Sequence, residues 1–388
     1  MNNTTYKLGQ LIQLSDKRNT DLKYGIDDVK GMTIDKTIIP TKADMSGTDL
    51  SKFIIVHPNE FIYNPRTHGK KIGLGFNDSG NNFLISWNNI AFKVKDSAKN
   101  IVIPRYLYMD FNRLEWDRRA CFDSWGTSTE VFTWDAMCDM EITLPPLSVQ
   151  KKYVDIYKSM VDNQKEYEKG IDDLKLVCDG FLDKLKREGE KVKIGEFIQQ
   201  SDIRNVKGEL TIENLKGIST DKSFISTKAD MKDVSLSNYK IVKQNEFVYV
   251  ADTSRRGDKI ALCINDSSDN YLVSSIYTVF KVKDEQKLNP NYLMMFFTRT
   301  EFDRYARFNS WGSARETFDW SEMCEVAIPI PDIHIQESIA NIYKVYIERK
   351  RIGEQLKKQI KDLCPILIKG SIEEADGSHG GTEHTEKG

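Results

Sequence analysis

The chain has 388 residues, of which 39% are apolar and 29% are charged. This composition is typical of a soluble globular protein, and the length predicts two or three domains. No apolar run reaches the roughly 18 to 20 residues needed to cross a bilayer, and the N-terminal segment MNNTTYKLGQ lacks the core of a signal peptide. The net charge of −2 argues against a free-standing nucleic-acid binder, which usually carries a basic excess.

The cysteines exclude two further classes of protein. They are scattered along the chain and form no C-x-x-C pair, which argues against both a disulfide framework and a zinc site. We therefore expect reduced thiols in a cytoplasmic protein. The six residues are Cys121, Cys138, Cys178, Cys263, Cys324 and Cys364.

An internal repeat is the strongest feature of the sequence. Shifted by 186 residues, the chain matches itself at 26 of 59 positions between 8–66 and 194–252. TKADM occurs in both copies, at 41–45 and 227–231, and SWGTSTEVFTWDAMC (124–138) aligns with SWGSARETFDWSEMC (310–324). The period is far longer than the roughly 20 to 50 residues of a solenoid repeat, so the sequence predicts a duplicated domain.

Each copy begins with a mixed α/β pattern. In the first copy, β-rich runs at 52–56, 82–86 and 90–94 alternate with Gly, Asn and Asp. A helix is predicted after Pro104, where apolar residues recur every three or four positions, and the second copy repeats this pattern after Pro290.

A long heptad pattern follows each of these mixed regions. From residue 150 the apolar steps alternate between four and three for about five heptads, with Lys and Glu on the flanks. The second copy repeats the pattern more loosely, and Pro365 predicts an end or a kink. Two such helices can bury their seams against each other as an antiparallel coiled coil, and a protruding spacer fits so long a seam better than a core helix does.

The sequence thus predicts an α+β protein in which two duplicated mixed α/β domains are separated by two long helices. The expected domains span 1–146 and 189–332, and the expected helices span 147–188 and 333–369. The tail at 370–388 is rich in Gly, Glu, Asp and His without apolar periodicity, so we expect it to be disordered.

The order of these parts resembles the specificity subunits of type I restriction-modification enzymes. Each copy opens with K-x-G, at 7–9 and 193–195, and closes with Ser-Trp-Gly and an apolar–Pro segment that leads to Gln150 or Gln336. NEFIYNPRTHGKKIG (59–73) is similar to a segment of that family. The copies also depart from the family pattern, since Thr129 stands where the second copy has the expected Arg315 and the second copy lacks the Asn-Pro of the first.

The resemblance implies a non-catalytic subunit with two target-recognition domains that bind double-stranded DNA. It also implies two methyltransferase subunits, which methylate adenine with S-adenosylmethionine, and restriction subunits that translocate DNA with ATP and magnesium. None of these cofactors is expected on this chain, so the expected cofactor and metal sets are empty.

Base edges are read by Arg, Lys, Asn and Gln, and other basic or hydroxyl groups bind phosphates. The main candidate is a basic, Gly-flanked loop between two strand-like runs, which also differs in length between the copies; a solvated hairpin turn is the alternative. Its residues are Arg66, Thr67, His68, Lys70 and Lys71 in the first copy and Ser254, Arg255, Arg256 and Lys259 in the second.

Further candidates repeat in both copies. The pairs Arg18–Asn19 and Arg204–Asn205 either contact bases or cap a turn, and Lys42 and Lys228 either contact phosphates or belong to a structured turn. Arg315 completes the set of expected DNA contacts, whereas Trp125 and Trp311 are interpreted as packing residues.

Sequence motifs of enzymes are incomplete here. The segment GLGFNDSG (73–80) lacks dinucleotide-binding spacing, and Asn64-Pro65 is followed by Arg66 rather than by the Pro-aromatic ending of an adenine methyltransferase motif. Two other functions stay open: the specificity portion of a type II restriction-methyltransferase, and a coiled-coil adaptor that binds protein rather than DNA.

Overall fold

The computed structural model describes residues 2–67, 71–126, 129–227, 234–253, 259–313 and 315–377. The chain divides into two compact units. Unit 1 comprises Met1–Glu166 and Gly353–Gly388, and unit 2 comprises Tyr167–Ile352. Within the described part, no helix combines the length and the apolarity that a bilayer span requires.

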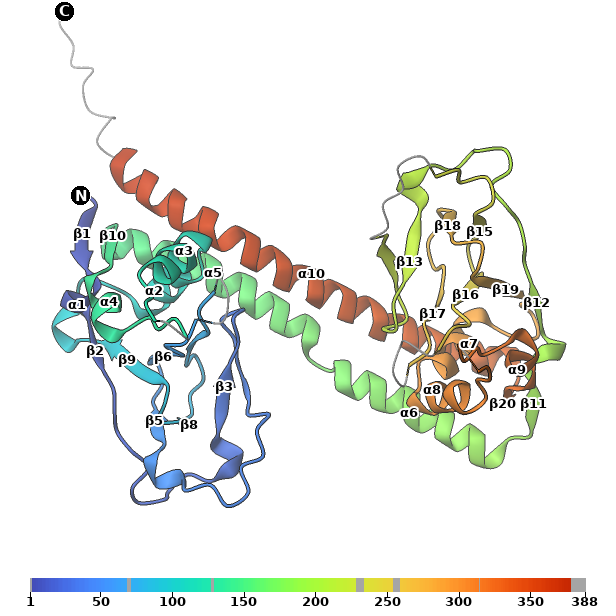
Figure 1. Ribbon diagram of the computed structural model, residues 1–388, viewed down its shortest axis with the longest axis horizontal. Coiled ribbons are helices and arrows are strands. Elements are labelled where there is room, and N and C mark those ends of the chain that lie inside the picture. The colour runs from blue at the N-terminus through green and yellow to red at the C-terminus, as the bar shows by residue number, and fades with distance from the viewer. Residues whose placement is uncertain are drawn as a thin grey trace, which may run out of the picture. The chain divides into compact units, whose positions relative to one another are not determined.

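Unit 1 is built on an antiparallel four-stranded sheet in the order β2-β9-β6-β7. Smaller pairs join β1 to β10, β3 to β4 and β5 to β8. Figure 1 shows the short helices α2, α3 and α4 beside α5 and the last part of α10, whereas β3, β5 and β8 extend toward the opposite end of the unit. The elements are β1 (Thr4–Lys7), α1 (Leu8–Leu11), β2 (Ile12–Leu14), β3 (Lys30–Met32), β4 (Ile38–Pro40), β5 (Ile54–Val56), β6 (Phe61–Tyr63), β7 (Leu74–Phe76), β8 (Phe83–Ile85), β9 (Ile90–Val94), α2 (Pro104–Phe111), α3 (Leu114–Phe122), α4 (Trp134–Asp139), β10 (Glu141–Leu144) and α5 (Leu147–Glu168).

Unit 2 repeats this topology strand for strand. Its sheet has the order β12-β19-β16-β17, with smaller pairs β11–β20, β13–β14 and β15–β18. Its elements are α6 (Ile171–Glu188), β11 (Lys191–Lys193), β12 (Ile198–Gln200), β13 (Lys216–Ile218), β14 (Phe224–Ser226), β15 (Lys240–Val242), β16 (Phe247–Tyr249), β17 (Leu262–Ile264), β18 (Tyr271–Val273), β19 (Thr278–Val282), α7 (Pro290–Phe297), α8 (Thr300–Phe308), α9 (Trp320–Glu325), β20 (Ala327–Pro329) and α10 (Ile333–Gly377), of which the last part belongs to unit 1.

Each unit has its own aromatic core, and the two cores have the same ring geometry. Phe61 stacks on Phe92 with ring centroids 4.9 Å apart, and Phe247 stacks on Phe280 at the same distance. The α2 and α7 helices cover these rings, and both begin with the proline that the sequence places at their first turn, where a missing N–H costs nothing. The duplication predicted from sequence is therefore a duplication of packing as well as of topology.

The long helices form antiparallel pairs within each unit. In unit 1, Lys152 of α5 bonds Glu374 of α10, and Tyr157 shares a buried cluster with Cys364. In unit 2, Arg349 of α10 donates to the carbonyl oxygen of Tyr167, and Cys178 of α6 shares a cluster with Tyr343. In both units, residue numbers rise along one helix of the pair while those of the contacting residues fall along the other, as expected for antiparallel helices.

Three details of the long helices differ from the sequence prediction. The first helix is not continuous over 147–188, because it breaks between α5 and α6 at Gly170, whose φ of 75° glycine adopts without strain. The second helix does not end at Pro365. It also continues past Gly370, where the sequence predicts the start of a disordered tail, and α10 ends at Gly377.

Packing within unit 1 explains why the helix continues past Pro365. Cys364, Ile368 and Ser371 are buried, and the Ser371 hydroxyl lies 2.6 Å from the hydroxyl of Tyr106. Such tertiary contacts outweigh the cost of a proline inside a helix, which is about 3 kcal/mol. The remaining residues of the predicted tail, 378–388, lie outside the described part of the chain.

Candidate nucleic-acid interface

The candidate DNA loop of unit 1 begins with one exposed and one buried residue. Arg66 is exposed, and its backbone N–H donates to Oδ1 of Asn64 at 3.0 Å. Thr67 is buried, and both its backbone N–H and its hydroxyl donate to the carbonyl oxygen of Glu130, at 3.1 and 3.2 Å. Thr67 therefore anchors the loop, and its side chain is buried at a position where the sequence predicts a DNA contact.

The other end of this loop is fixed by a buried ion pair. Nζ of Lys36 lies 2.6 Å from Oδ1 of Asp117 and donates to the carbonyl oxygen of Ile72 at 3.2 Å. The Ile72 N–H points at the same carboxylate oxygen, at 3.4 Å. Burial lowers the pKa of Lys36, and Asp117 opposes that shift. Lys71, which precedes Ile72, is only partly buried.

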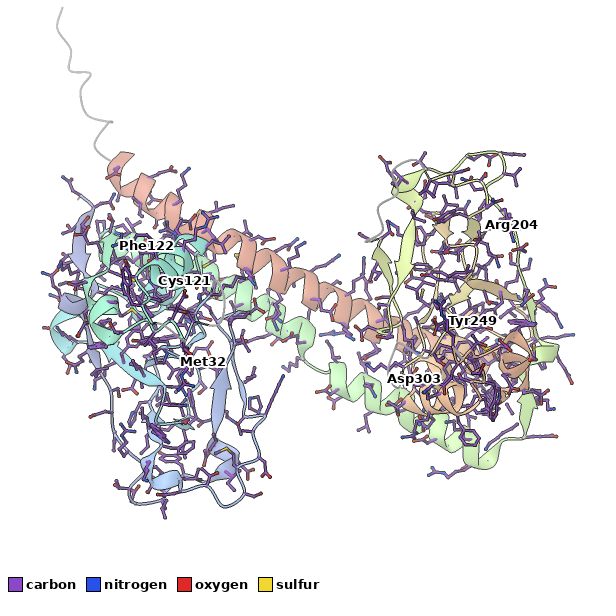
Figure 2. All side chains as sticks on the ribbon, in the orientation of Figure 1. Met32, Cys121, Phe122, Arg204, Tyr249 and Asp303 are labelled. Atoms are coloured by element: carbon purple, nitrogen blue, oxygen red, sulfur yellow. The ribbon has the colours of Figure 1, made fainter. Side chains whose placement is uncertain are left out.

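Unit 2 holds its corresponding loop in the same way. Lys222 lies 2.6 Å from Asp303, and it donates to the carbonyl oxygen of Ile260 at 2.8 Å (Asp303 is labelled in Figure 2). Thr253 is buried and bonds the carbonyl oxygen of Glu316, as Thr67 does with Glu130. Lys259 is exposed and lies 3.7 Å from the Asp221 carboxylate.

Several of the predicted DNA contacts lie outside the described residues. They are His68, Lys70, Lys228, Ser254, Arg255 and Arg256. The described ends of both candidate loops are held by the same kinds of contact in the two units.

A small hollow of about 80 Å³ lies at the base of the loop in unit 1. It has room for a few water molecules and no more. Arg66 and Lys71 both line it, so the structure brings these two predicted residues together. Its other lining residues are Met32 (labelled in Figure 2), Ile34, Asn64 and Gly73.

Asn19 and Asn205 close turns and do not face solvent. The Asn19 side chain is fully buried, where its amide donates to the carbonyl oxygen of Tyr24 at 3.0 Å and its oxygen accepts from the Tyr24 N–H at 3.2 Å. Asn205 makes the same two bonds with Leu210, at 2.9 and 3.1 Å. Both polar ends are used within the turn, which matches the alternative that these residues cap a turn, and the base contacts stay a prediction.

The arginines that precede them are exposed but are bound to the protein. Arg18 donates to the carbonyl oxygen of Lys52 at 2.8 Å. Arg204, which Figure 2 places away from the short helices of unit 2, pairs with both oxygens of Asp202 at 3.1 and 3.2 Å. A phosphate would have to compete with these groups, whereas Lys42 and Arg315 are exposed without any such contact in the described part of the chain.

The tryptophans of the two Ser-Trp-Gly segments contradict their interpretation as packing residues. Trp125 is 79% exposed and Trp311 is 63% exposed. Phe122 and Phe308, the last residues of α3 and α8, are exposed as well. Sequence reasoning missed these residues because large aromatic side chains are usually buried. Their repetition just before a glycine was the available signal.

Gln150 and Gln336, which open the long helices, attach each helix to its own unit. The Gln150 amide donates to the carbonyl oxygens of Ile101 and Pro145, both at 2.8 Å, and its oxygen accepts from the Ile103 N–H at 3.0 Å. Gln336 makes three equivalent bonds. The repeated glutamine therefore has a structural role at the helix start.

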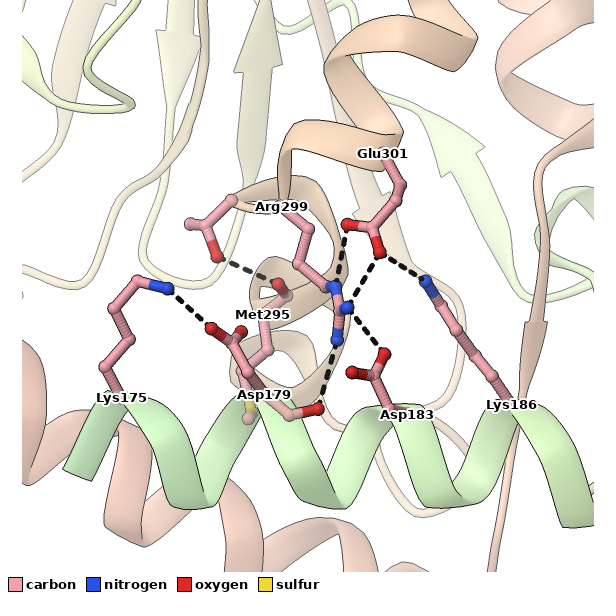
Figure 3. Close-up of polar contacts among 8 residues, drawn as sticks. Lys175, Asp179, Asp183, Lys186, Met295, Arg299 and Glu301 are labelled. Atoms are coloured by element: carbon pink, nitrogen blue, oxygen red, sulfur yellow. Dashed lines mark hydrogen bonds and ion pairs between the residues drawn. The ribbon is translucent and has the colours of Figure 1, made fainter. Parts of the chain in front are cut away.

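Arg299 attaches the short helices of unit 2 to the long helix α6. The corresponding residue of unit 1, Arg113, makes no such bond to a long helix within the described residues. Figure 3 shows the Arg299 guanidinium between Glu301, at 2.8 Å, and Asp183 of α6, at 2.6 Å. It also donates to the carbonyl oxygen of Asp179 at 3.2 Å. Arg113 pairs with Asp110 of α2 at 2.9 Å and lies 3.6 Å from Glu115 of α3, so neither partner belongs to a long helix.

The comparisons with known proteins agree with this architecture. A family model described as the type I restriction modification DNA specificity domain matches residues 187–362. The S subunit of a type I restriction-modification system from M. genitalium has the same fold: the TM-score is 0.60 at 10% sequence identity, over 97% of this chain and 96% of that one.

Two other solved structures are similar at lower scores. The HsdS subunit from Thermoanaerobacter tengcongensis has 12% identity and a TM-score of 0.35, over 95% of this chain and 96% of that one. A chain from a structure of the complex assembly and conformational transition of the type I R-M system has 12% identity and a TM-score of 0.39, over 96% and 97%.

The fold is thus that of a protein with two duplicated mixed α/β domains and long helices, and the predicted fold class is confirmed. Residues 187–362 match the model of the type I restriction modification DNA specificity domain, which confirms the resemblance that the sequence motifs show. Unit 1 repeats the sheet order and the loop anchors of this domain.

Proposed function

We propose that the chain is the sequence-specific DNA-binding subunit of a type I restriction-modification complex, and that it reads a bipartite target with one half-site for each unit. The observation that carries this proposal is the pair of candidate loops. Both are anchored by a buried threonine and a buried Lys–Asp pair. Between these anchors the residues differ in type and number.

Such a division of roles suits DNA recognition. A fixed scaffold holds the reading segment at a set position, and side-chain changes within the segment alter which base edges it can bond. In our proposal each unit enters a major groove, and the long helices set the unread gap between the half-sites.

The partners in this proposal are double-stranded DNA, two methyltransferase subunits and restriction/translocase subunits. The methyltransferase subunits would dock along the long helices and supply the chemistry, so this chain would be non-catalytic and would bind no S-adenosylmethionine, ATP or magnesium. Isothermal titration of the purified chain with S-adenosylmethionine tests that part, and saturable binding would contradict it. The free cysteines suit a reducing cytoplasm, where we place its action.

A methylation map tests the DNA-reading role directly. The chain is expressed with the methyltransferase subunit of its own system in a host without DNA methylation, and modified adenines are located by single-molecule sequencing. We expect two short half-sites around a fixed gap. A stable complex of the two proteins that methylates no DNA would contradict the proposal and favour an adaptor that binds protein.

Exchange of the loops assigns the half-sites. When residues 66–71 are replaced by 252–259, one half of the motif should change and the other should stay. The matched control exchanges 79–81 for 267–269, a turn at which the two units have similar sequences. A motif that changes in the control, or in both halves, would show that the loop is not the reading segment.

A further inference from the structure

The exposed tryptophans lie on a small β layer that includes Arg66, the first residue of the candidate loop in unit 1, and Asp252, which aligns with Arg66 in unit 2. In unit 1, Trp125 and Val131 exchange backbone hydrogen bonds of 3.2 and 3.0 Å, and Arg66 is bridged to the other side of Val131. Directly opposed residues of antiparallel strands project from the same face. Arg66, Val131 and Trp125 therefore form one row of side chains, here named the cross-strand row.

Unit 2 has the same row at the corresponding positions. Trp311 and Thr317 exchange hydrogen bonds of 3.0 and 2.9 Å, and Asp252 is bridged to the other side of Thr317. The row of unit 2 is thus Asp252, Thr317 and Trp311. Each unit has a tryptophan at the same position of its row, whereas the residues at the other two positions differ in charge and polarity between the units.

Glycine fixes the turn that follows each tryptophan. Gly126 has a φ of 155° and Gly312 a φ of 141°. A Cβ at either position would collide with the carbonyl oxygen of Thr129 or Arg315. The glycine therefore fixes the backbone from which the exposed indole projects, which reduces the backbone entropy lost when a partner binds.

Each unit also has an exposed arginine in the short helix that precedes the tryptophan in the sequence. Arg118 stands one helical turn before Phe122 in α3, and Arg304 stands one turn before Phe308 in α8. Both arginines are exposed, and within the described residues neither has an acidic partner. Exposed aromatic residues and unpaired arginines within one short segment suit a polyanion that also offers apolar edges, which is the chemistry of a DNA groove.

We propose that the cross-strand row of each unit faces the base edges of duplex DNA, with Trp125 and Trp311 as the contact common to both half-sites. The indole packs against apolar groups such as a thymine methyl or a deoxyribose. The two variable positions beside it give each unit its own sequence preference. This inference rests on the DNA-reading function proposed above and adds residues that lie outside the predicted loop.

The test compares tryptophan variants of the assembled complex. The probe is a fluorescent duplex that carries the motif recovered from the methylation map, and binding is followed by anisotropy. We expect Trp125→Ala and Trp311→Ala each to weaken binding by about tenfold or more, as for loss of a specific groove contact. The matched control is Trp87→Ala, since Trp87 is 60% exposed in unit 1 but lies outside the row.

Two measurements distinguish DNA contact by the cross-strand row from a role of the same residues in docking a protein. Co-purification of the methyltransferase subunit with each variant reports assembly, which we expect to be unchanged. Loss of assembly would overturn the proposal in favour of a protein-docking surface, and unchanged DNA affinity would overturn it outright. If the unaltered complex yields no target at all, the proposed function fails, and that result is distinct from both.

Protection of the indole supplies a measurement that does not depend on affinity. Acrylamide quenches exposed tryptophans, so saturating the complex with the duplex should reduce quenching. Trp125→Phe and Trp311→Phe together should abolish that reduction. If the protection persists in the double variant, the DNA does not cover these residues.

Discussion

In unit 1, Lys36 binds Asp117 at 2.6 Å, and in unit 2, Lys222 binds Asp303 at the same distance. The two units also share their sheet order, their aromatic stacks and the glutamine at the helix start. They differ in the cross-strand rows, where unit 1 has Arg66 and Val131 and unit 2 has Asp252 and Thr317 at the corresponding positions. The comparison separates residues that stabilise the fold of both units from residues that make the surface of each unit different.

Removal of the buried lysine should have the largest effect, and it should be similar in the two units. Lys36→Met or Lys222→Met leaves a buried carboxylate without its partner. We expect a loss of about 3–5 kcal/mol in the free energy of unfolding. Urea unfolding measures the loss, and hydrogen exchange assigns it to unit 1 or unit 2.

A paired replacement supplies the control for this prediction. Lys36→Met combined with Asp117→Leu removes both charges, and it should recover much of the lost stability because no unpaired charge stays buried. A double variant as unstable as the single one would show that the ion pair is not the cause. A large difference between the two units would break their equivalence.

The shared scaffold illustrates how far sequence reasoning reaches. Residue identities at a fixed offset predict the duplicated fold, and the heptad spacing of apolar residues predicts the long helices. Neither pattern predicts the Lys–Asp pair, since Lys36 and Asp117 come from distant segments and each looks like an ordinary surface residue. Their partnership depends on how a hairpin turn and α3 pack together, and that information is absent from local spacing.

Loss of the helix-opening glutamine should be the next largest effect. Gln150→Ala or Gln336→Ala leaves backbone groups without partners in a partly or fully buried place. We expect each to cost about 1–3 kcal/mol in the free energy of unfolding. Thermal and urea unfolding of both variants measure it. Equal losses would support equivalent attachment of the two helices, and a loss below about 0.5 kcal/mol would contradict the structural role.

Arg299 should matter more than Arg113, because it joins α8 to α6 in unit 2. We expect Arg299→Lys to lower the free energy of unfolding by about 1–2 kcal/mol, since lysine cannot reproduce the forked bonds. Arg113→Lys is the matched control and should cost less. Equal costs would mean that the link to α6 contributes nothing.

The same site predicts a pH dependence. The hydrogen bond from Arg299 lowers the pKa of Glu301 to about 2 from an ordinary value of 4.5. A lowered carboxyl pKa stabilises the folded state above the ordinary value, and that contribution is lost as the pH falls from about 4.5 toward 2. Urea unfolding across this range should show a shallower decline for Arg299→Ala than for the unaltered chain. Parallel curves would contradict the assignment.

The candidate site was harder to predict than the fold. Basic and amide residues suggested DNA contact at Asn19 and Thr67, yet both are buried and bonded to backbone groups. Trp125 was expected to be packed and is exposed. Residue type decides what a side chain can bond, but exposure depends on which segments cover it, and the sequence pattern at a turn does not reveal that.

Loss of an exposed ion pair should change the free energy of unfolding least, and each unit offers one such pair for comparison. Lys361 pairs with Asp35 at 2.7 Å in unit 1, and Lys175, at the corresponding position of the repeat, pairs with Asp179 at 2.5 Å in unit 2. Both lysines are exposed by more than half, so water and salt compete with each pair. We expect Lys361→Ala and Lys175→Ala each to change the free energy of unfolding by less than about 1 kcal/mol.

Salt provides the check on this last prediction. The small effect of either variant should shrink further between low salt and about 1 M salt, where charges are screened within a few ångströms. The loss caused by Lys36→Met should persist, because its pair is shielded from solvent. If Lys361→Ala proved as costly as Lys36→Met, contacts to α10 rather than the internal scaffold would stabilise unit 1, and the two units would no longer be equivalent.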